Sequence, residues 1–562
     1  MKNLEIAKIL FEIADLLELQ GVRFKPRAYQ MAARTVENLS EDIEEIYKRG
    51  ELTELPGIGE SIAQKIEELI KTGKLKYYND LKKKLPMDVE QLGKIPGMGP
   101  KRIKLLYEKL KVKTLSDLKK AAQQHKIREL RGLGEKIEAD VLKGIKSAKK
   151  GGRFLLGYIM PLAEEIKTEL GKLKEVSAVE IAGSYRRRKE MVGDIDILAV
   201  SSQPSRVMEH FVHMKVVADV LAKGSTRSSV RLHNGLQIDL RVVASKEFGS
   251  ALQYFTGNKE HNVELRKIAL AHGYTLNEYG LFTLNKKWVA GRTEEEIYKK
   301  LGVVCVSPEM RENTGELALK KVPSLIGYGD AQGDFQTHTT WSDGNDSIEA
   351  MATKAQSLGW KFITITDHVG QVRITNPLNE KRLEKQAAEI KKLNKRLDIR
   401  IFHGAEVDIL KNGTLALSKE WQKKLDVVLA SVHLATKMGE KEMTQRICTA
   451  MENRVHILGH PTGRQLEKRE AYAMNLDKVF ECARRNDVHL DIDCHPERMD
   501  LGGEQVKAAK GCTFVLSTDA HGVDGLHFLS LGEAIARRGW LSAKDVLNTY
   551  SVKEIEKVLG GK

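Results

Sequence analysis

The sequence predicts a multidomain protein with an all-α N-terminal region, an α+β middle part and a C-terminal α/β domain of the barrel type. Its 562 residues correspond to about three to five domains of ordinary size. Residues 4–150 place apolar side chains three and four positions apart, which is the spacing of helices. After residue 333, short β-branched runs alternate with helical stretches, as in an α/β barrel.

The N-terminal region is the most basic part of the chain. The whole sequence has 92 Lys and Arg against 77 Asp and Glu, a net charge of +15. Residues 1–150 contain 32 basic and 23 acidic side chains, so they carry nine of these fifteen charges. Such a surplus favours a polyanionic partner, first of all a nucleic acid, although an acidic protein or a membrane surface would also fit.

The cysteine content and the hydropathy pattern predict a cytoplasmic protein that does not enter a membrane. The five cysteines are odd in number, scattered and without a CxxC pair, which argues against a disulfide framework or a zinc finger. There is no run of eighteen apolar residues. The first helical stretch also contains acidic residues within its apolar pattern, unlike a signal peptide.

Three segments of the helical region share the pattern apolar-x-Gly-apolar-Gly ahead of a helix: residues 55–66, 95–106 and 130–142. Two glycines one residue apart allow a tight turn that exposes backbone N–H groups at a helix N-terminus, where a phosphate oxygen can bind. This pattern resembles the helix-hairpin-helix motif, which binds a nucleic-acid backbone without reading its sequence. The alternative is an ordinary helical connection with a glycine cap. The candidate DNA-binding glycines are Gly57, Gly59, Gly97, Gly99, Gly132 and Gly134.

A first chemical site is predicted on two strands of the middle region. Asp194 and Asp196 are two residues apart on one strand and therefore point to the same face, and Asp239 lies inside a second alternating strand. Three clustered carboxylates need a cation, and oxygen ligands suit Mg²⁺ or Mn²⁺. Two such ions could activate an attacking hydroxyl group and stabilise a leaving pyrophosphate. The preceding Gly183, Ser184 and Arg187 offer donors for a triphosphate; without them, solvent-exposed acids would be the simpler interpretation.

These motifs resemble a known family. The segments GSYRRRKEMVGDIDIL (183–198), QIDLRVV (237–243) and YFTGNKEHNVELR (254–266) closely resemble the catalytic core of family X DNA polymerases, the group that contains DNA polymerase beta. The segment 271–282 resembles the thumb of that family, and 24–33 with 55–66 resemble its small DNA-end-binding domain. The resemblance covers residues 1–315.

The resemblance implies a role for each matching residue. Asp194, Asp196 and Asp239 would bind two Mg²⁺ or Mn²⁺ ions, and Asp239 would take the proton of the primer 3′-hydroxyl. Lys259 stands where DNA polymerase beta has an acid, which affects nucleotide affinity and the closing motion. The implied nucleotide-binding residues are Gly183, Ser184, Arg187 and Gly193 for the phosphates, Tyr254, Phe255 and Gly257 for the sugar, and Asn262 and Arg266 for the minor groove.

Lys65 matches the lysine that forms a Schiff base with a 5′-deoxyribose phosphate in beta-type enzymes. That chemistry requires a lowered pKa, which neighbouring cations can produce. Lys25 and Tyr29 would support the same pocket. Ser61 replaces the companion lysine of the family, so lyase activity and simple binding of the 5′-phosphate both remain open.

A second chemical site is predicted in the C-terminal region, which holds ten of the sixteen histidines between residues 330 and 562. These histidines follow apolar strands together with acidic residues. Strand ends at one rim of a barrel are where ligands converge, and mixed His, Asp and Glu sets suit Mn²⁺, Zn²⁺ or Fe²⁺.

As an ordered set these residues resemble the PHP (polymerase and histidinol phosphatase) domain, a distorted α/β barrel that hydrolyses phosphoesters with two or three metal ions. The resemblance implies Mn²⁺ or Zn²⁺ and a 3′→5′ exonuclease, with cleavage at abasic sites as a further activity. Two departures matter: Gln336 stands where the pattern has a histidine, and 489–501 carries Asp491 and Asp493 where Glu and Asn are expected. The implied ligands are His338, Asp343, His368, Glu406, His433, His460, Asp519 and His521.

Together these patterns predict a repair polymerase that fills short gaps, using deoxynucleoside triphosphates and gapped or nicked DNA with a 5′-phosphate. Alternatives are a PHP hydrolase on a DNA-binding platform, a polymerase whose PHP domain is weakened by Gln336, and a non-enzymatic end-binding scaffold. No motif identifies a protein partner. The expected parts are a helical end-binding domain (1–80), helix-hairpin-helix fingers (81–150), a nucleotidyltransferase palm (151–244), a thumb (245–315), a linker (316–332) and the PHP domain (333–562).

Overall fold

The computed structural model describes most of residues 3–560. Its contacts divide the chain into two compact units: residues 1–154, 167–183 and 193–305 form the first, and 155–166, 184–192 and 306–562 form the second. Within residues 3–560 the structure does not describe positions 20, 21, 23, 24, 38, 40, 41, 85–91, 93–99, 131, 132, 135–137, 139, 140 and 142–151.

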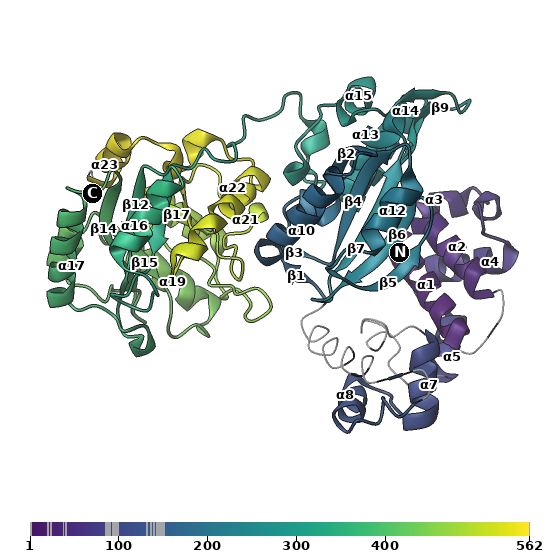
Figure 1. Cartoon of the computed structure of the whole chain (residues 1–562), viewed down its shortest axis with the longest axis horizontal. Coiled ribbons are helices and arrows are strands. Elements are labelled where there is room, and N and C mark those ends of the chain that lie inside the picture. Colours follow the sequence, from purple (N-terminus) through teal and green to yellow (C-terminus); the bar gives the residue numbers. More distant parts are fainter. Residues whose placement is uncertain are drawn as a thin grey trace. The chain divides into compact units, whose positions relative to one another are not determined.

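The described part of the N-terminal region is helical, as predicted (Figure 1), and the side chains of its first five helices form one apolar core. Ile6, Leu10 and Ile13 on the first helix are fully buried against the others. The fourth helix begins after Gly59 and ends at Gly73, whose positive φ closes the helix. The helices are α1 (Asn3–Leu19), α2 (Lys25–Glu37), α3 (Ile43–Lys48), α4 (Glu60–Thr72) and α5 (Lys76–Lys84).

A second, smaller helical core follows around α7 (Pro100–Leu110) and α8 (Leu115–Gln123). Thr114 and Asp117 form a capping box that defines the start of α8. Of the predicted glycine pairs, Gly57, Gly59 and Gly134 are described, whereas Gly97, Gly99 and Gly132 lie outside the described residues.

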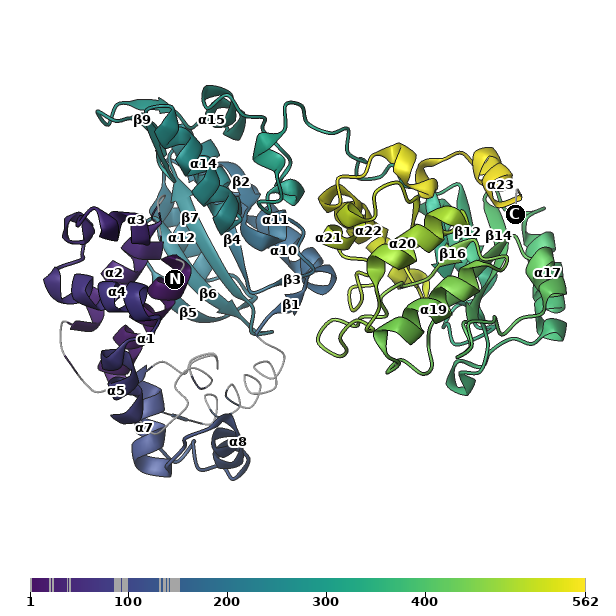
Figure 2. The ribbon, with the colours of Figure 1, turned by 180° about the vertical axis from the view of Figure 1, so that it is seen from behind.

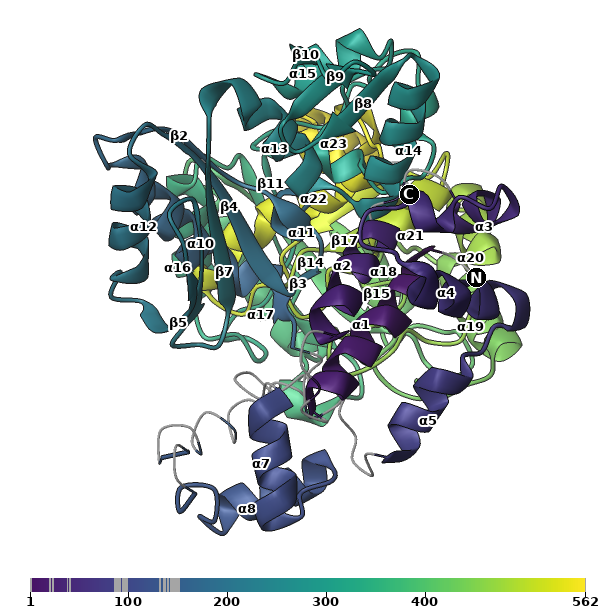
Figure 3. The same ribbon diagram turned by 90° about the vertical axis from the view of Figure 1, so that its right-hand side faces the viewer.

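The palm is a five-stranded sheet in the order β2-β4-β7-β6-β5. Strands β4 and β7 are parallel neighbours, visible side by side in Figure 3, and the other pairs are antiparallel. The helix α12 (Pro204–Val212) contacts β5, β6 and β7, and α13 (Phe248–Thr256) contacts β4. The strands are β2 (Val176–Ile181), β4 (Asp194–Ser201), β5 (Val217–Lys223), β6 (Arg227–Leu232) and β7 (Gln237–Val243).

Shorter elements flank this sheet. The strands β1 (Phe154–Leu155) and β3 (Met191–Val192) pair with each other, and α10 (Leu156–Gly171) and α11 (Gly183–Arg186) lie between them in sequence. The predicted thumb contains α14 (Lys259–Ala271), the antiparallel strands β8 (Tyr274–Asn277), β9 (Gly280–Thr283) and β10 (Trp288–Ala290), and α15 (Glu294–Lys300). Asn258 and Thr293 cap α14 and α15 with their side chains.

The C-terminal domain is a nearly closed barrel of parallel strands, which confirms the predicted fold class. A bridge between Thr337 and Ala520 brings the first and last strands together. The strand order is β11-β12-β14-β15-β16-β17-β18, and β13 pairs with β14. The strands are β11 (Gly333–Thr337), β12 (Phe362–Ile365), β13 (His368–Val369), β14 (Arg400–Asp408), β15 (Val427–Ser431), β16 (Ile457–Leu458), β17 (His489–Asp493) and β18 (Phe514–Ser517).

Helices alternate with these strands and surround them (Figure 2). Four of these helices begin with a polar N-cap residue whose side chain accepts a hydrogen bond from a backbone N–H of the first turn: Ser347, Asn379, Ser418 and Asn475. The helices are α16 (Ile348–Ser357), α17 (Glu380–Leu393), α18 (Lys419–Lys424), α19 (Glu440–Met451), α20 (Leu476–Arg485), α21 (Gly503–Ala508), α22 (Leu529–Arg538) and α23 (Val552–Gly560).

Three further observations bear on the sequence predictions. The argument against disulfides is wrong for Cys448 and Cys482: α19 and α20 pack together and place their Cα atoms 5.6 Å apart in a disulfide. The predicted linker contains buried Glu316 and Ile326. None of the helices in the described part of the chain has the length and apolar character needed to span a lipid bilayer.

Candidate active sites

The palm sheet brings the three predicted carboxylates together. β4 begins at Asp194, and its parallel pairing with β7 sets Asp196 directly beside Asp239. Ile195 and Ile197 alternate with the acids and are fully buried, which orients the acids to the opposite face. The three acids therefore lie close together on one face of the sheet, as the strand alternation predicted.

The electrostatics of this cluster call for a cation. Burial, followed by repulsion from Asp194 and Asp239, raises the pKa of Asp196 to about 7. Burial and Asp239 also raise the pKa of Asp194. Because these carboxylates repel one another and their oxygen atoms are hard ligands, the residues fit Mg²⁺ or Mn²⁺. A Cβ atom at Gly183, whose φ is +65°, would lie 2.9 Å from Asp196 Oδ2, so a side chain at this position would have to displace that carboxylate.

Sequence reasoning missed the residues that hold Asp239. Ser229 donates a hydrogen bond to Asp239 Oδ1, and Gln237 Nε2 donates to Oδ2 at 2.9 Å. Arg227 Nη2 lies 3.7 Å from Asp239 Oδ1. Ser229 faces Asp239 in the antiparallel β6–β7 register, so only the strand alignment could have revealed that contact, whereas Gln237 lies two residues before Asp239 on the same strand.

Of the predicted sugar and minor-groove residues, Tyr254 and Phe255 lie on α13, Gly257 directly follows that helix, and Asn262 and Arg266 lie on α14. The rings of Tyr254 and Phe255 meet edge to face with centroids 5.1 Å apart. Asn262 Nδ2 donates to the Tyr254 carbonyl at 2.7 Å, and Arg266 Nε donates to the Asn262 carbonyl at 3.3 Å. Gln253, which the sequence did not single out, donates to Asn262 Oδ1 at 2.7 Å and fixes its orientation.

The other predicted nucleotide residues lie in or next to α11 and at the start of β4. Gly183 and Ser184 belong to α11, and Gly193 directly precedes β4. Arg187 Nε lies 3.0 Å from Glu312 Oε1, and Lys189 Nζ lies 3.4 Å from Glu312 Oε2. The basic loop therefore has a carboxylate partner that sequence reasoning did not find.

Lys65 lies on α4 in an environment that favours its neutral form. Burial and then the positive charge of Lys25 lower the pKa of Lys65. Its Nζ atom donates to the Ser61 carbonyl at 2.8 Å and lies 4.9 Å from the ring centroid of Tyr77. Tyr77 stacks on the predicted Tyr29, whose pKa is raised by burial.

Gly57 and Gly59 form the turn before α4. Gly57 has φ +79°, a backbone conformation that favours glycine, and a Cβ atom there would lie 3.3 Å from Met31 Cβ. Gly59 is the N-cap of α4. The predicted exposure of backbone N–H groups at a helix start is therefore compatible with this turn.

The barrel brings the second predicted set together at the carboxyl ends of its strands. His338 follows β11, His368 begins β13, Glu406 lies within β14, and His433 and His460 follow β15 and β16. Asp519 and His521 follow β18, and Asp343 lies in the loop after β11. Because the strands are parallel, these ends share one rim.

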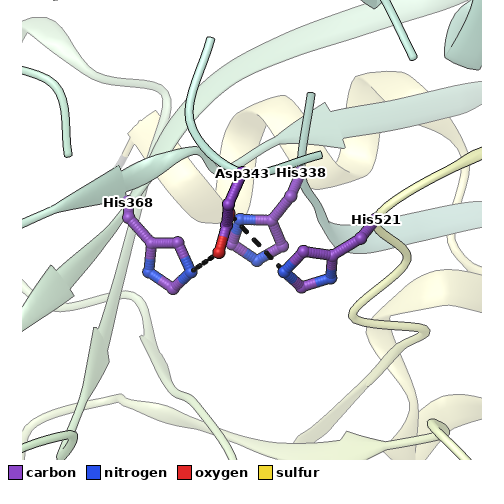
Figure 4. A group of neighbouring side chains, drawn as sticks. All are labelled: His338, Asp343, His368 and His521. Carbon is purple, nitrogen blue, oxygen red and sulfur yellow. Dashed lines mark ion pairs between the residues drawn. The ribbon is translucent and has the colours of Figure 1, made fainter. Parts of the chain in front are cut away.

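Two groups of potential ligands lie at this rim in the described part of the chain. His338, Asp343, His368 and His521 form the first, with Asp343 carboxylate oxygens 3.6 Å from the Nε2 atoms of His368 and His521 (Figure 4). His368, Glu406 and His433 form the second, and every ligand atom within a group lies within 4.8 Å of the others.

Glu406 connects the predicted ligands. Its Oε1 atom lies 3.2 Å from His433 Nε2 and 3.0 Å from His460 Nε2, and its Oε2 atom lies 3.0 Å from His368 Nδ1. His338 Nε2 lies 3.1 Å from Asp519 Oδ1. All eight predicted ligands are thus brought together, and this mixed set of imidazoles and carboxylates fits Mn²⁺ or Zn²⁺.

The charges of this site depend on one another. Burial raises the pKa of Glu406, but His433 and His368 outweigh it and hold that pKa well below its usual value. Burial lowers the pKa of His368 to about 4, whereas Glu406 and Asp408 overcome burial and raise that of His433 to about 10. A bound cation would replace the His433 proton as the partner of Glu406.

Several supporting residues were not predicted. Asp408 Oδ1 lies 2.6 Å from His433 Nδ1 and orients that ring. Arg498 Nε lies 3.2 Å from Asp493 Oδ2 and 3.5 Å from Asp519 Oδ2. Only the folded strand order could reveal these partners.

Gln336, the first departure from the PHP pattern, is fully buried and lies beside the predicted ligands. Its Nε2 atom donates to Asp519 Oδ1 at 3.2 Å, and Ser517 Oγ donates to its Oε1 atom at 3.5 Å. The Gln336 amide therefore contacts a potential metal ligand, and its own oxygen atom would bind a transition metal more weakly than an imidazole nitrogen.

Five protein-family models match successive parts of the chain. The matching family models are a helix-hairpin-helix domain (residues 1–75), a SAM-like helix-hairpin-helix tandem (89–147), the DNA polymerase beta palm (159–253), the DNA polymerase beta thumb (251–312) and the PHP domain (334–495).

One similar protein matches this chain over its full length, and others match part of it. The DNA polymerase/3′-5′ exonuclease PolX of Bacillus subtilis is 35% identical over 569 residues, covering 100% of this chain and 99% of that protein. DNA polymerase lambda of Rattus norvegicus is 23% identical over 55% of this chain and 56% of its own length. A solved structure of Leishmania infantum polymerase beta has a TM-score of 0.32 and 23% identity, and covers 40% of this chain and 97% of that one.

A palm with a cluster of three carboxylates, a thumb and helix-hairpin-helix segments together define a nucleotidyltransferase of the DNA polymerase beta type. The chain belongs to the family X DNA polymerases that carry a C-terminal PHP domain, as the sequence resemblance predicted.

The raised pKa of Asp196 predicts pH-dependent metal binding in the palm. Below about pH 7 a proton competes with the cation for this carboxylate, so the apparent affinity for Mn²⁺ should fall by about tenfold for each further pH unit. Mn²⁺ titration followed by electron paramagnetic resonance at pH 8, 7 and 6, with Asp196→Asn subtracted as the baseline, measures this. A palm affinity that stays constant between pH 8 and 6 would contradict the prediction.

The contact between Asp408 and His433 predicts a role in metal affinity for a residue that is not itself a proposed ligand. Asp408→Asn should weaken Mn²⁺ or Zn²⁺ binding at the PHP site by about ten- to a hundredfold, because the His433 ring loses its orienting carboxylate. Calorimetric titration in an Asp239→Ala background measures it. Asp426→Asn, which changes a carboxylate paired with Arg400, is the matched control and should leave binding unchanged.

Proposed function

We propose that this protein fills short gaps in DNA during repair and that its PHP domain removes nucleotides from 3′ ends. The observation that carries the polymerase proposal is the parallel register that sets Asp196 beside Asp239, with Asp194 on the same face. The full-length similarity to a protein named DNA polymerase/3′-5′ exonuclease supports both activities.

In the polymerase reaction, Asp194, Asp196 and Asp239 would hold two Mg²⁺ or Mn²⁺ ions. Such ions activate the primer hydroxyl and stabilise the pyrophosphate that leaves. Asp239, held by Ser229 and Gln237, would accept the proton of the 3′-hydroxyl.

The incoming deoxynucleoside triphosphate would be bound by residues from two separate stretches of sequence, 183–193 and 254–266. Ser184 and Arg187, with the backbone of Gly183 and Gly193, would bind its phosphates. The sugar would lie against Tyr254, Phe255 and Gly257. Asn262, oriented by Gln253, and Arg266 would contact the minor groove, where they test the width of the base pair.

In the PHP domain, the eight residues around Glu406 would hold Mn²⁺ or Zn²⁺, two or three ions in all. These ions supply a hydroxide nucleophile at neutral pH. The chain itself contributes the orientation of His433 by Asp408 and the hydrogen bond from Gln336 to Asp519. The phosphodiester at a 3′ end is the proposed substrate, and cleavage at abasic sites is a further activity of the same centre.

The N-terminal helices would bind the downstream end of a gap. The turn at Gly57 and Gly59 offers backbone N–H groups to phosphate oxygens, and Lys25 and Lys65 add positive charge. Gapped or nicked DNA with a 5′-phosphate is therefore the proposed partner, and the cytoplasm is the proposed location.

One observation favours a second candidate function, a polymerase with a weakened exonuclease. Gln336 replaces an imidazole with an amide that is already hydrogen-bonded to Asp519 and Ser517. A metal ion at this position would have one weaker ligand than elsewhere in the site.

A single assay tests the two proposed activities. A labelled gapped duplex with a 5′-phosphate is incubated with Mn²⁺ or Mg²⁺, with and without nucleotides. We expect Asp239→Ala to lose extension and keep 3′ shortening, and His433→Ala to lose shortening and keep extension, each by at least about a thousandfold because a metal ligand is removed.

The outcomes of this assay separate the candidates. Extension without any 3′ shortening in the wild-type protein would favour the polymerase with an inactive PHP domain. If no extension occurs with either metal, the polymerase proposal is wrong.

The environment of Lys65 supports a 5′-deoxyribose phosphate lyase. Its neutral amine would attack the sugar aldehyde and release water as the Schiff base forms. Borohydride reduction should trap wild-type protein on an incised abasic duplex, and Lys65→Arg should abolish trapping while keeping a positive charge for the 5′-phosphate. Equal trapping in Lys65→Arg would show that another amine reacts, and no trapping in the wild type would leave Lys65 a phosphate-binding residue.

A further inference from the structure

The segment Ser184–Val192, which contains the proposed phosphate-binding residues Ser184 and Arg187, belongs to the same compact unit as the PHP domain. One of its residues, Glu190, contacts two arginines of that domain. Glu190 Oε2 lies 2.9 Å from Arg538 Nη1, and Glu190 Oε1 lies 3.6 Å from Arg464 Nη2. The function proposed above uses none of these three residues.

This ion pair is buried. The side chains of Glu190 and Arg538 are 14% and 4% exposed. Removing one partner of a buried pair leaves the other charge without compensation, which costs far more than the loss of a surface pair. Arg538 Nη1 also lies 3.5 Å from the carbonyl oxygen of Arg188, so the same side chain holds the backbone of the segment.

A second contact holds the neighbouring residue. The Arg188 guanidinium carbon lies 5.1 Å from the ring centroid of Tyr185 and 5.9 Å from that of Tyr328. The Tyr328 hydroxyl donates to Glu309 Oε1 at 2.7 Å, and Arg537 Nε lies 2.9 Å from the same oxygen. The segment is therefore fixed on both sides of Lys189.

Arg464 extends the contact toward the PHP ligands. Its Nε atom donates to the Arg498 carbonyl at 3.1 Å, and Nη2 donates to the Met499 carbonyl. The side chain of Arg498 in turn lies 3.5 Å from Asp519. A continuous series of polar contacts thus runs from Glu190 to the rim of the barrel.

We propose that the PHP domain positions the triphosphate-binding segment of the polymerase through Arg538 and Arg464, with Glu190 as the residue that they hold. Arg538, Arg464 and Glu190 are then positioning residues for nucleotide binding, a role separate from the nuclease activity of that domain. The inference rests on the proposed polymerase function. Ser184 and Arg187 can bind a triphosphate tightly only if their backbone is held in place before the nucleotide arrives.

Single-nucleotide insertion into a gapped duplex by the full chain tests this role. We expect Arg538→Gln and Glu190→Gln to raise KM for the nucleotide by about tenfold while kcat changes by less than about threefold, because ground-state binding is what the segment provides. Arg538→Lys keeps the charge and should recover part of the loss. Arg400→Gln, which removes another PHP arginine with two carboxylate partners, is the matched control and should match the wild type.

Of the two arginine contacts with Glu190, Arg464→Gln removes only the one at 3.6 Å, and it is the milder variant if Arg538→Gln and Glu190→Gln fail to fold. It should raise KM in the same direction, by less than about tenfold. An unchanged KM in Arg538→Gln and Glu190→Gln, even with a lower melting temperature, would overturn the proposal, because the pair would then serve stability alone. If the wild-type protein inserts no nucleotide, the polymerase function fails and this inference fails with it.

Discussion

Buried carboxylates that share a small space are stable only when positive charge lies among them, and both candidate sites of this chain are built around that constraint. In the palm, burial together with repulsion from Asp194 and Asp239 raises the pKa of Asp196 to about 7. In the PHP domain, Glu406 is surrounded by histidines that hold its pKa low. The first group needs a divalent cation, and the second holds protons where a metal ion would bind.

The same architectural device forms both sites. Neighbouring parallel strands place their ligands at one edge: the palm acids lie at the starts of β4 and β7, whereas the barrel ligands lie toward the carboxyl ends of its strands. The palm does this with two strands, and the barrel does it with most of the strands in its sheet. Supporting residues then fix the ligands: Ser229 and Gln237 hold Asp239, and Asp408 holds His433.

The sequence predicted the fold class, and its strand patterns and family motifs pointed to the acids and histidines that the structure brings together. The alternation around Asp194 and Asp196 determined their common face, and TFVLSTDAH placed Asp519 and His521 after a buried strand. It could not show which residues on other strands support them. Ser229, Gln253, Asp408 and Arg498 have no motif of their own, and their roles depend on strand register and helix packing. The Cys448–Cys482 disulfide was not predicted for the same reason, since only the packing of α19 on α20 brings the two residues together.

The central claim is that one chain carries two separate metal-dependent sites, and crystals loaded with Mn²⁺ test it most directly. An anomalous difference map should show one set of peaks beside Asp194, Asp196 and Asp239 and a second set around Glu406, His433 and His460. Peaks at only one of these places, after loading at a pH above 7 where Asp196 is ionised, would contradict the account.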